Sequence, residues 1–98
     1  ENMSWLELPD GSRQEIFGSG GGQAVADSLT RSIGAEVSLL GQIPLDTTLR
    51  IGADEGMPVV LGQPDSPAAV ALRGIARGLA SRARGLAGRS LGLTPAGR

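Results

Sequence analysis

Asp46 and the residues just before it form the stretch of this 98-residue chain that is best suited to ligand binding. An apolar run ends abruptly at Pro44, and Asp46 follows two residues later. A buried strand that leads into a ligand-facing turn and a new helix has this pattern, and ligands of parallel sheets bind beyond the carboxyl ends of the strands. Composition and pattern alone predict a soluble α/β piece of something larger and assign it no function.

The residue types that are missing exclude several kinds of chemistry. The chain has no Cys, His, Tyr or Lys, and all nine of its basic residues are arginine. Thiolate and imidazole metal sites are therefore excluded, which leaves only carboxylate sites for hard cations. Catalytic triads that need an imidazole or a thiol cannot be assembled. A phosphate-binding loop with its lysine cannot lie within this chain either.

Charge is distributed unevenly along the chain. The first 65 residues contain all ten acids and three arginines, a net charge of −7, whereas the last 33 residues contain six arginines and no acid, a net charge of +6. This asymmetry indicates either a basic contact surface or a solvated helix face that pairs with acids elsewhere, and the second interpretation is the simpler one. No signal peptide or membrane-spanning run is visible. Because the first residue is Glu rather than Met, we expect a longer reading frame.

A glycine cluster, Gly18–Gly22 with one serine, opens a predicted helix. Val25, Leu29 and Ile33 recur at helical spacing and give that helix one apolar stripe, and Gly34 is placed to end it. Glycines before a helix N-terminus can hold an anion, since free N–H groups and the helix dipole point the same way. The cluster lacks the spacing of a dinucleotide fingerprint, so a hinge or tight turn is the favoured interpretation.

The other elements are indicated by turn and cap signals. Residues Trp5–Phe17 read as a β-hairpin around a Pro-Asp-Gly-Ser turn. Residues Val37–Ile43 are apolar on both alternating faces, as in a strand covered by helices on both sides. Asp46 is a suitable N-cap for a helix over 47–54, which Gly56 would close, and 57–61 reads as a short apolar connector.

Ser66-Pro67 is the clearest helix start in the chain, a capping hydroxyl followed by proline at the first helical position. The helix that follows has an aliphatic stripe with arginines on its flank. Residues 85–98 contain many glycines and read as a flexible basic tail, so we expect a domain part over 1–84. Alternation of strand and helix predicts a parallel sheet, whose remaining strands must lie upstream or in another chain.

Five short blocks occur in an order that resembles the C-terminal part of the Mrp/ApbC family, the iron–sulfur carrier P-loop ATPases related to MinD and ParA. The resemblance runs from Glu1 to about Ala83, and the tail looks like the actinobacterial branch of that family. The blocks are Glu1-Asn2-Met3-Ser4, Ile16-Phe17-Gly18-Ser19-Gly20-Gly21-Gly22, Gly41-Gln42-Ile43-Pro44-Leu45-Asp46, Gly56-Met57-Pro58-Val59-Val60 and Pro64-Asp65-Ser66-Pro67-Ala68-Ala69.

The resemblance implies the C-terminal part of a doubly wound, mostly parallel P-loop NTPase sheet, with a small hairpin insertion and a C-terminal helix. It implies ATP and Mg²⁺ as cofactors, slow ATP hydrolysis, a homodimer in the cytoplasm and transfer of iron–sulfur clusters to apoprotein clients. Carried over to this sequence, Asn2, Pro44 and Asp46 line the base end of the nucleotide site.

Two departures from the family pattern change what this chain can do. The Walker A loop is absent, so the chain alone is expected neither to bind nor to hydrolyse ATP usefully. Many members of the family carry Cys-Pro-x-Cys after Glu-Asn-Met-Ser, whereas this chain has Leu8 and Gly11 at the cysteine positions and keeps Pro9. Cluster ligation needs thiolates, which argues against a cluster held by these residues.

Two alternatives to the carrier interpretation remain open at this point. The first is a non-enzymatic module that dimerises or binds a partner through its hairpin and basic helix. The second is a membrane-surface role for the arginine-flanked helix 72–86, which the modest, glycine-interrupted stripe disfavours. Nucleic-acid binding is not expected, because basic and aromatic residues are not interleaved.

Overall fold

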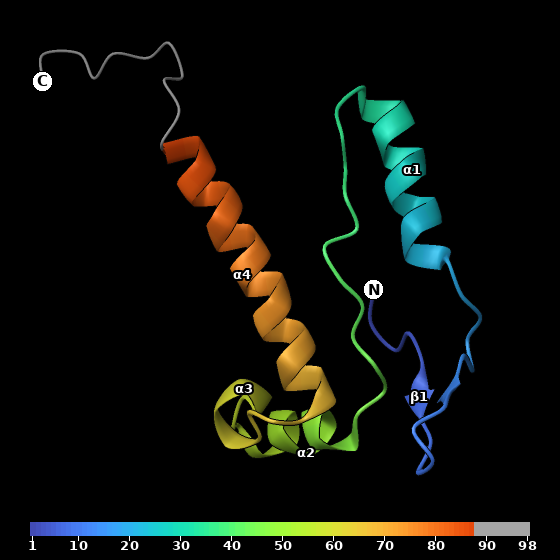
Figure 1. Cartoon of the computed structure of the whole chain (residues 1–98), viewed down its shortest axis with the longest axis vertical. Coiled ribbons are helices and arrows are strands. Elements are labelled where there is room, and N and C mark those ends of the chain that lie inside the picture. The colour runs from blue at the N-terminus through green and yellow to red at the C-terminus, as the bar shows by residue number, and fades with distance from the viewer. Residues whose placement is uncertain (88–98) are drawn as a thin grey trace, which may run out of the picture.

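The computed structural model of the protein describes residues 1–87, in which a small hairpin precedes a series of helices (Figure 1). The elements are β1 (Leu6–Glu7), β2 (Arg13–Gln14), α1 (Gly21–Ile33), α2 (Thr47–Glu55), α3 (Val59–Gly62) and α4 (Pro67–Ala87). The extended stretch between α1 and α2 runs through the middle of the molecule, with α1 on one side and α4 on the other (Figure 1).

The predicted hairpin is confirmed, although its ladder is short. β1 pairs with β2 in antiparallel fashion, with Leu6 opposite Gln14. Its turn is closed by hydrogen bonds from Leu8 N–H to the Ser12 carbonyl (2.8 Å) and from Gly11 N–H to the Leu8 carbonyl (2.9 Å). A hairpin with strands of two residues is marginal by itself in water, so its order depends on what lies beside it.

The extended segment 41–45 lies beside residues 1–5 and runs in the same direction. Ile43 N–H donates to the Glu1 carbonyl (2.8 Å), Ser4 N–H donates to the Ile43 carbonyl (3.0 Å), and Leu45 N–H donates to the Trp5 carbonyl (2.8 Å). These bonds have the alternating pattern of a parallel pair. A one-residue bulge interrupts it at Met3, whose φ of 54° lies in the left-handed region.

The predicted strand over Val37–Ile43 is therefore only partly right. The segment is extended, but no regular strand forms there within residues 1–87. The physical reason is that, within residues 1–87, only residues 1–5 pair with it through backbone hydrogen bonds, and the bulge at Met3 breaks that pairing. The described residues thus contain a fragment of parallel pairing and no doubly wound sheet.

Helix ends follow the sequence signals closely. Gly34 and Gly56 end α1 and α2 in the left-handed conformation, with φ of 76° and 74°. Asp46 caps α2, and the Ser66 hydroxyl accepts a hydrogen bond from Ala69 N–H (3.2 Å) in the first turn of α4. The apolar connector predicted at 57–61 is wrong in part, because Pro58 starts a turn of helix that becomes α3.

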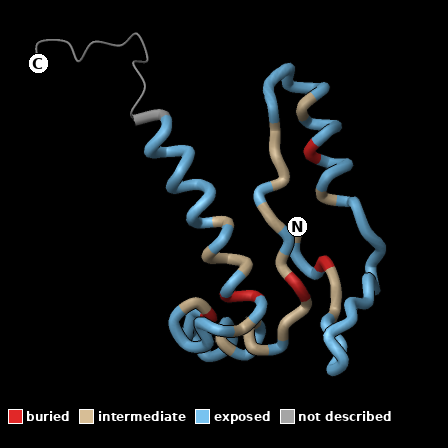
Figure 2. The backbone as a smooth tube through the Cα atoms, in the orientation of Figure 1, coloured by how far each residue is buried: buried red, intermediate tan, exposed pale blue. Residues whose placement is uncertain are grey.

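The buried residues are few among residues 1–87; three of them lie where α3 meets the start of α4, and Ser4, Ala26 and Pro44 are buried singly elsewhere (Figure 2). Ala68 and Ala69 are fully buried and Val59 is 4% exposed. By contrast, the apolar stripe of α1 is largely uncovered, with Val25 at 59% and Ile33 at 64% exposure. Within residues 1–87, α1 packs against no other helix or strand, which explains why its stripe remains open.

The C-terminal helix is longer than its glycine content predicts. It continues to Ala87, so the first three residues of the expected tail (85–98) are helical. Residues 88–98 lie outside the described residues. No helix among residues 1–87 combines the length and the apolar composition that crossing a bilayer requires.

Candidate functional site

Asp46 joins the N-termini of two helices through its carboxylate. Oδ1 accepts hydrogen bonds from the backbone N–H (2.9 Å) and the hydroxyl (2.5 Å) of Thr48, in the first turn of α2. Oδ2 accepts a hydrogen bond from the backbone N–H of Ala68, in the first turn of α4, at 3.0 Å. N–H groups in a first turn have no partner inside their own helix and carry partial positive charge, so one carboxylate satisfies both ends.

These hydrogen bonds keep Asp46 ionised. Partial burial, the largest single contribution, raises the pKa of the carboxyl, but donation from Thr48 and Ala68 outweighs it and leaves the pKa below its ordinary value. Both oxygens are occupied by the chain's own donors. The geometry therefore makes Asp46 a tie between α2 and α4.

An open groove of about 450 Å³ lies beside Asp46. The turn Pro44–Thr47 lines it, together with Leu6 and Glu7 of β1, Arg50 of α2 and Pro67 of α4. Its volume falls within the range of about 300–1,000 Å³ that is typical of small-molecule sites. The groove lies beyond the end of the extended segment 41–45, which is where a parallel sheet places its ligands.

The structure places the three predicted site residues differently. Pro44 and Asp46 line the groove, whereas Asn2 does not. Asn2 is exposed on the neighbouring segment, and its Oδ1 accepts a hydrogen bond from Met3 N–H (2.8 Å). Within residues 1–87 its side-chain N–H₂ group donates no hydrogen bond. Leu6 and Glu7 also line the groove and were missed, because no sequence signal shows that a hairpin strand lies opposite a turn almost forty residues later.

The glycine cluster does hold an anion, which is the side chain of Glu1. Gly22 N–H, in the first turn of α1, donates to Glu1 Oε2 at 2.5 Å, and the Ser4 hydroxyl donates to Oε1 at 2.7 Å. A Cβ built on Gly22 would lie 2.9 Å from that carboxylate oxygen and 3.0 Å from the Leu39 side chain. The absence of a side chain at Gly22 thus allows the carboxylate to reach the helix end.

We expect Glu1→Gln to loosen the first turn of α1, because it removes the charge that attracts the helix N-terminus. Hydrogen bonds from Ser4, then from Gly22 and Gln42, lower the pKa of Glu1. The stabilisation is therefore fully present above the ordinary pKa of a glutamate and is lost as the pH falls through the lowered value. Amide hydrogen exchange in the first turn of α1 measures the effect.

Glu15→Gln is the matched control, since Glu15 is exposed and makes no side-chain hydrogen bond within residues 1–87. Faster exchange in α1 for the Glu1 variant alone is the expected result. Equal exchange in both variants would show that the carboxylate of Glu1 does not hold the helix end.

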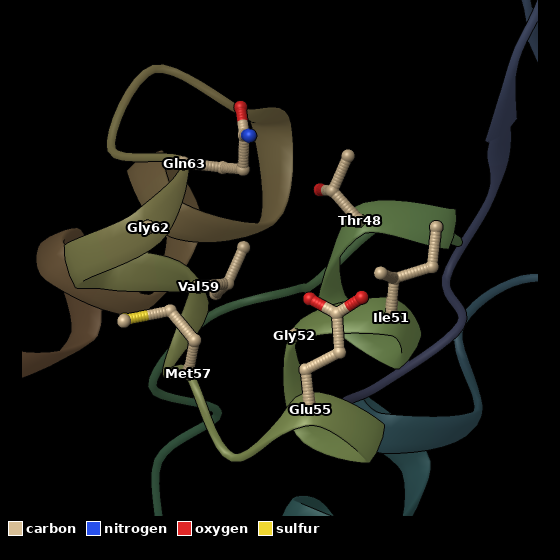
Figure 3. A pocket seen from close by; sticks show the side chains of 8 residues that line it. All are labelled: Thr48, Ile51, Gly52, Glu55, Met57, Val59, Gly62 and Gln63. Carbon is tan, nitrogen blue, oxygen red and sulfur yellow. The ribbon is translucent and has the colours of Figure 1, made fainter.

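A second groove lies between α2 and α3 and has a volume of about 210 Å³ (Figure 3). Its lining is apolar or neutral except for Glu55 of α2, whose carboxylate is directed toward the other lining residues (Figure 3). The Thr48 hydroxyl in this lining donates to Asp46, and the lining contains no cation, so the Glu55 carboxylate has no partner for a reaction here. This groove is therefore the weaker candidate.

The hairpin tip is closed by hydrogen bonds. Leu8 and Gly11 occupy the positions at which the resemblance places cysteines. Asp10 Oδ1 instead accepts hydrogen bonds from the Ser12 hydroxyl (2.5 Å) and N–H (2.9 Å), and these two interactions lower the pKa of Asp10. Within residues 1–87 no three His, Cys, Asp or Glu side chains gather as metal ligands. The donor set at the tip does not fit an iron–sulfur cluster, which needs thiolates.

Comparison with known proteins gives one coherent result. Residues 1–80 match the ParA family model described as NUBPL iron-transfer P-loop NTPase. The chain is 57% identical over its whole length to the "Iron-sulfur cluster carrier protein" of Mycobacterium leprae and 56% identical to that of Mycobacterium tuberculosis. Over 84% of the chain it is 46% identical to the protein of the same name from Deinococcus radiodurans. It spans 26% of the length of the mycobacterial proteins and 21% of the Deinococcus protein.

Proposed function

Because this chain belongs to the ParA family of NUBPL iron-transfer P-loop NTPases, we propose that it forms the base end of the nucleotide site in an ATP-dependent iron–sulfur cluster carrier. One observation supports this more than any other. The parallel extended segments 1–5 and 41–45 end beside a groove of about 450 Å³, the first at β1 and the second at the Pro44–Thr47 turn. In a doubly wound parallel sheet, a ligand binds at this position.

The proposed fold is the C-terminal part of such a sheet. Gln42 supports it, because its backbone N–H and C=O find no partner within residues 1–87 and so offer a free edge for another strand. The exposed stripe of α1, at Val25, Leu29 and Ile33, supports it further as a surface for the helix to pack on such a sheet. Both features are expected where other segments of the same domain complete the core.

The groups for the phosphates and Mg²⁺ must come from outside this chain, because it contains no lysine. A bound ATP would supply the γ-phosphoryl group that is transferred to water. In this proposal the Pro44–Thr47 turn, which lines the groove, positions the base. By family resemblance Asn2, which lies outside the groove lining, donates its side-chain amide to the base. Asp46 keeps that turn fixed between α2 and α4.

An iron–sulfur cluster is the cargo of the proposed carrier, and this chain offers it no thiolate ligand. Any cluster must therefore be bound by cysteines elsewhere in the polypeptide or in a partner. The homodimer, the apoprotein clients and the cytoplasmic location are extensions of the same proposal by family resemblance. The non-enzymatic partner-binding module remains the second candidate, favoured by the closure of the hairpin tip through the hydrogen bonds of Ser12 to Asp10.

Asn2→Ala tests the nucleotide site in the full-length protein that carries this chain. We expect Mg-ATP to bind about tenfold more weakly, because a neutral hydrogen bond contributes roughly 0.5–1.5 kcal/mol. Calorimetric titration measures the affinity, and Gln23→Ala on the exposed side of α1 serves as the control, since it also removes an amide. Binding of ATP that is undiminished in Asn2→Ala, or absent in the unaltered protein, would contradict the proposal.

A further inference from the structure

The hairpin faces the groove without packing against a helix. Within residues 1–87, β1 and β2 contact each other, and neither strand packs on any helix. Leu6 and Glu7 nevertheless line the same groove as Arg50 of α2 and Pro67 of α4. The groove is thus an open space with the hairpin as one wall and the helix starts as the other.

The hairpin is attached at its root to the turn that forms the rest of the groove. Leu45, in the middle of that turn, donates its N–H to the carbonyl of Trp5 (2.8 Å), the residue just before β1. Arg13 of β2 stacks its guanidinium 3.9 Å from the centre of the Trp5 ring, which is a cation–π contact. Any movement of the hairpin therefore involves the two residues that anchor it, Trp5 and Arg13.

We propose that β1 supplies the outer wall of the nucleotide-base site, so that a bound base orders the hairpin. This inference rests on the proposed function, since it takes the base to occupy the groove beside Pro44–Thr47. A two-stranded hairpin gains stability when a third surface packs on it, and a planar base between Leu6 and the turn provides that surface. The half-buried Leu6 contacts the base, and the exposed Glu7 stands at the edge of the groove.

The consequence is that the order of the hairpin depends on the bound base, although the hairpin is distant from the reacting phosphates. When the base site is empty, the hairpin is held by its short ladder, its closed tip and the Arg13–Trp5 contact. When the site is filled, the hairpin is also held by the ligand. The hairpin tip at Leu8–Gly11 would then be presented in a fixed orientation only by the nucleotide-bound protein.

Hydrogen exchange on the full-length protein that carries this chain tests the coupling directly. The amides of Leu8 and Gly11, which close the hairpin turn, report its order. We expect Mg-ATP to slow their exchange about tenfold and Mg-tripolyphosphate, which has no base, to leave it unchanged. The emission of Trp5 at the root of the hairpin gives a second readout, assigned by comparison with Trp5→Phe.

Leu6→Ala and Leu8→Ala form a matched pair on the same hairpin. Leu6 lines the groove and Leu8 does not. We expect Leu6→Ala to weaken ATP binding about tenfold, because a buried apolar contact with the base is lost, and Leu8→Ala to leave it unchanged. Equal losses in both variants would show that the hairpin acts through general stability and would overturn the inference.

The failure of this inference can be told apart from the failure of the proposed function. Normal ATP affinity with unchanged exchange at Leu8 and Gly11 would overturn the role of the hairpin and leave the nucleotide site intact. Exchange at Leu8 and Gly11 that is slowed by Mg-tripolyphosphate would also overturn it, because the phosphates rather than the base would then order the hairpin. No ATP binding by the unaltered protein would overturn both proposals.

Discussion

Replacing Asp46 by alanine is expected to lower the free energy of unfolding by about 2 kcal/mol. The helix α2 loses its N-cap, which typically costs about 0.5–2 kcal/mol, and α4 loses one hydrogen bond in its first turn, where the Ser66 cap remains. The carboxylate bonds to Thr48 in α2 and to Ala68 in α4, which are twenty residues apart in sequence. Urea unfolding of the full-length protein measures the change. Loss of this tie also releases the turn that lines the groove.

Asp46→Asn distinguishes the contribution of the hydrogen bond to Thr48 from that of the hydrogen bond to Ala68. An asparagine keeps one carbonyl oxygen and remains a good N-cap, so it can still bond to Thr48 but cannot also accept from Ala68. We therefore expect about half the loss seen with alanine. Asp54→Ala is the control, since Asp54 forms an exposed ion pair with Arg50 at 3.0 Å, and such pairs contribute only about 0–1 kcal/mol.

The pH dependence of Asp46 has a definite sign. Its pKa is lowered in the folded protein, so its stabilisation is complete above the ordinary aspartate pKa, about 4, and is lost as the pH falls through the lowered value. The difference in stability between the unaltered protein and Asp46→Asn should be constant near neutral pH and shrink in acid. A difference that does not change with pH would show that the charge of Asp46 has no part in the tie.

Local signals predicted the helix ends because the groups involved are close in sequence. The Asp46 carboxylate caps α2 by accepting a hydrogen bond from Thr48, two residues later. Gly34 and Gly56 adopt the left-handed conformation next to the helices they end, and Ser66-Pro67 starts α4. Each signal needs only the backbone geometry of one turn. These features follow from composition and spacing without knowledge of the tertiary structure.

The interactions that the sequence could not show link distant residues. Nothing in the glycine cluster reveals that its anion is Glu1, and nothing near Asp46 reveals that its second oxygen bonds to Ala68. The amphipathic pattern of α1 predicted an apolar stripe correctly, but periodicity cannot tell which segment covers it. The same limit applies to the groove, where Leu6 was not predicted beside Pro44.

Gly52→Ala is the second change with a large expected effect. Gly52 lies in α2, facing the start of α3 (Figure 3), and its carbonyl accepts a hydrogen bond from Met57 N–H (2.8 Å). A Cβ at this position would lie 2.5 Å from the Met57 carbonyl oxygen, a backbone atom that cannot move aside alone. Overpacking of this kind costs about 1–3 kcal/mol, which exceeds the gain of up to about 1 kcal/mol from replacing glycine by alanine in a helix.

Gly74→Ala makes the same chemical change in α4 with the opposite expected sign. A Cβ on Gly74 would meet nothing within 4 Å, and the residue is exposed in the helix interior. The substitution should therefore raise the free energy of unfolding by about 0.5–1 kcal/mol through helix propensity alone. Urea unfolding of Gly52→Ala and Gly74→Ala measures the sign of the change in the free energy of unfolding for each variant. If both substitutions stabilise the protein, then α2 and α3 are not packed as closely at Gly52 as the structure shows, and the α2–α3 corner is not a fixed support for Asp46.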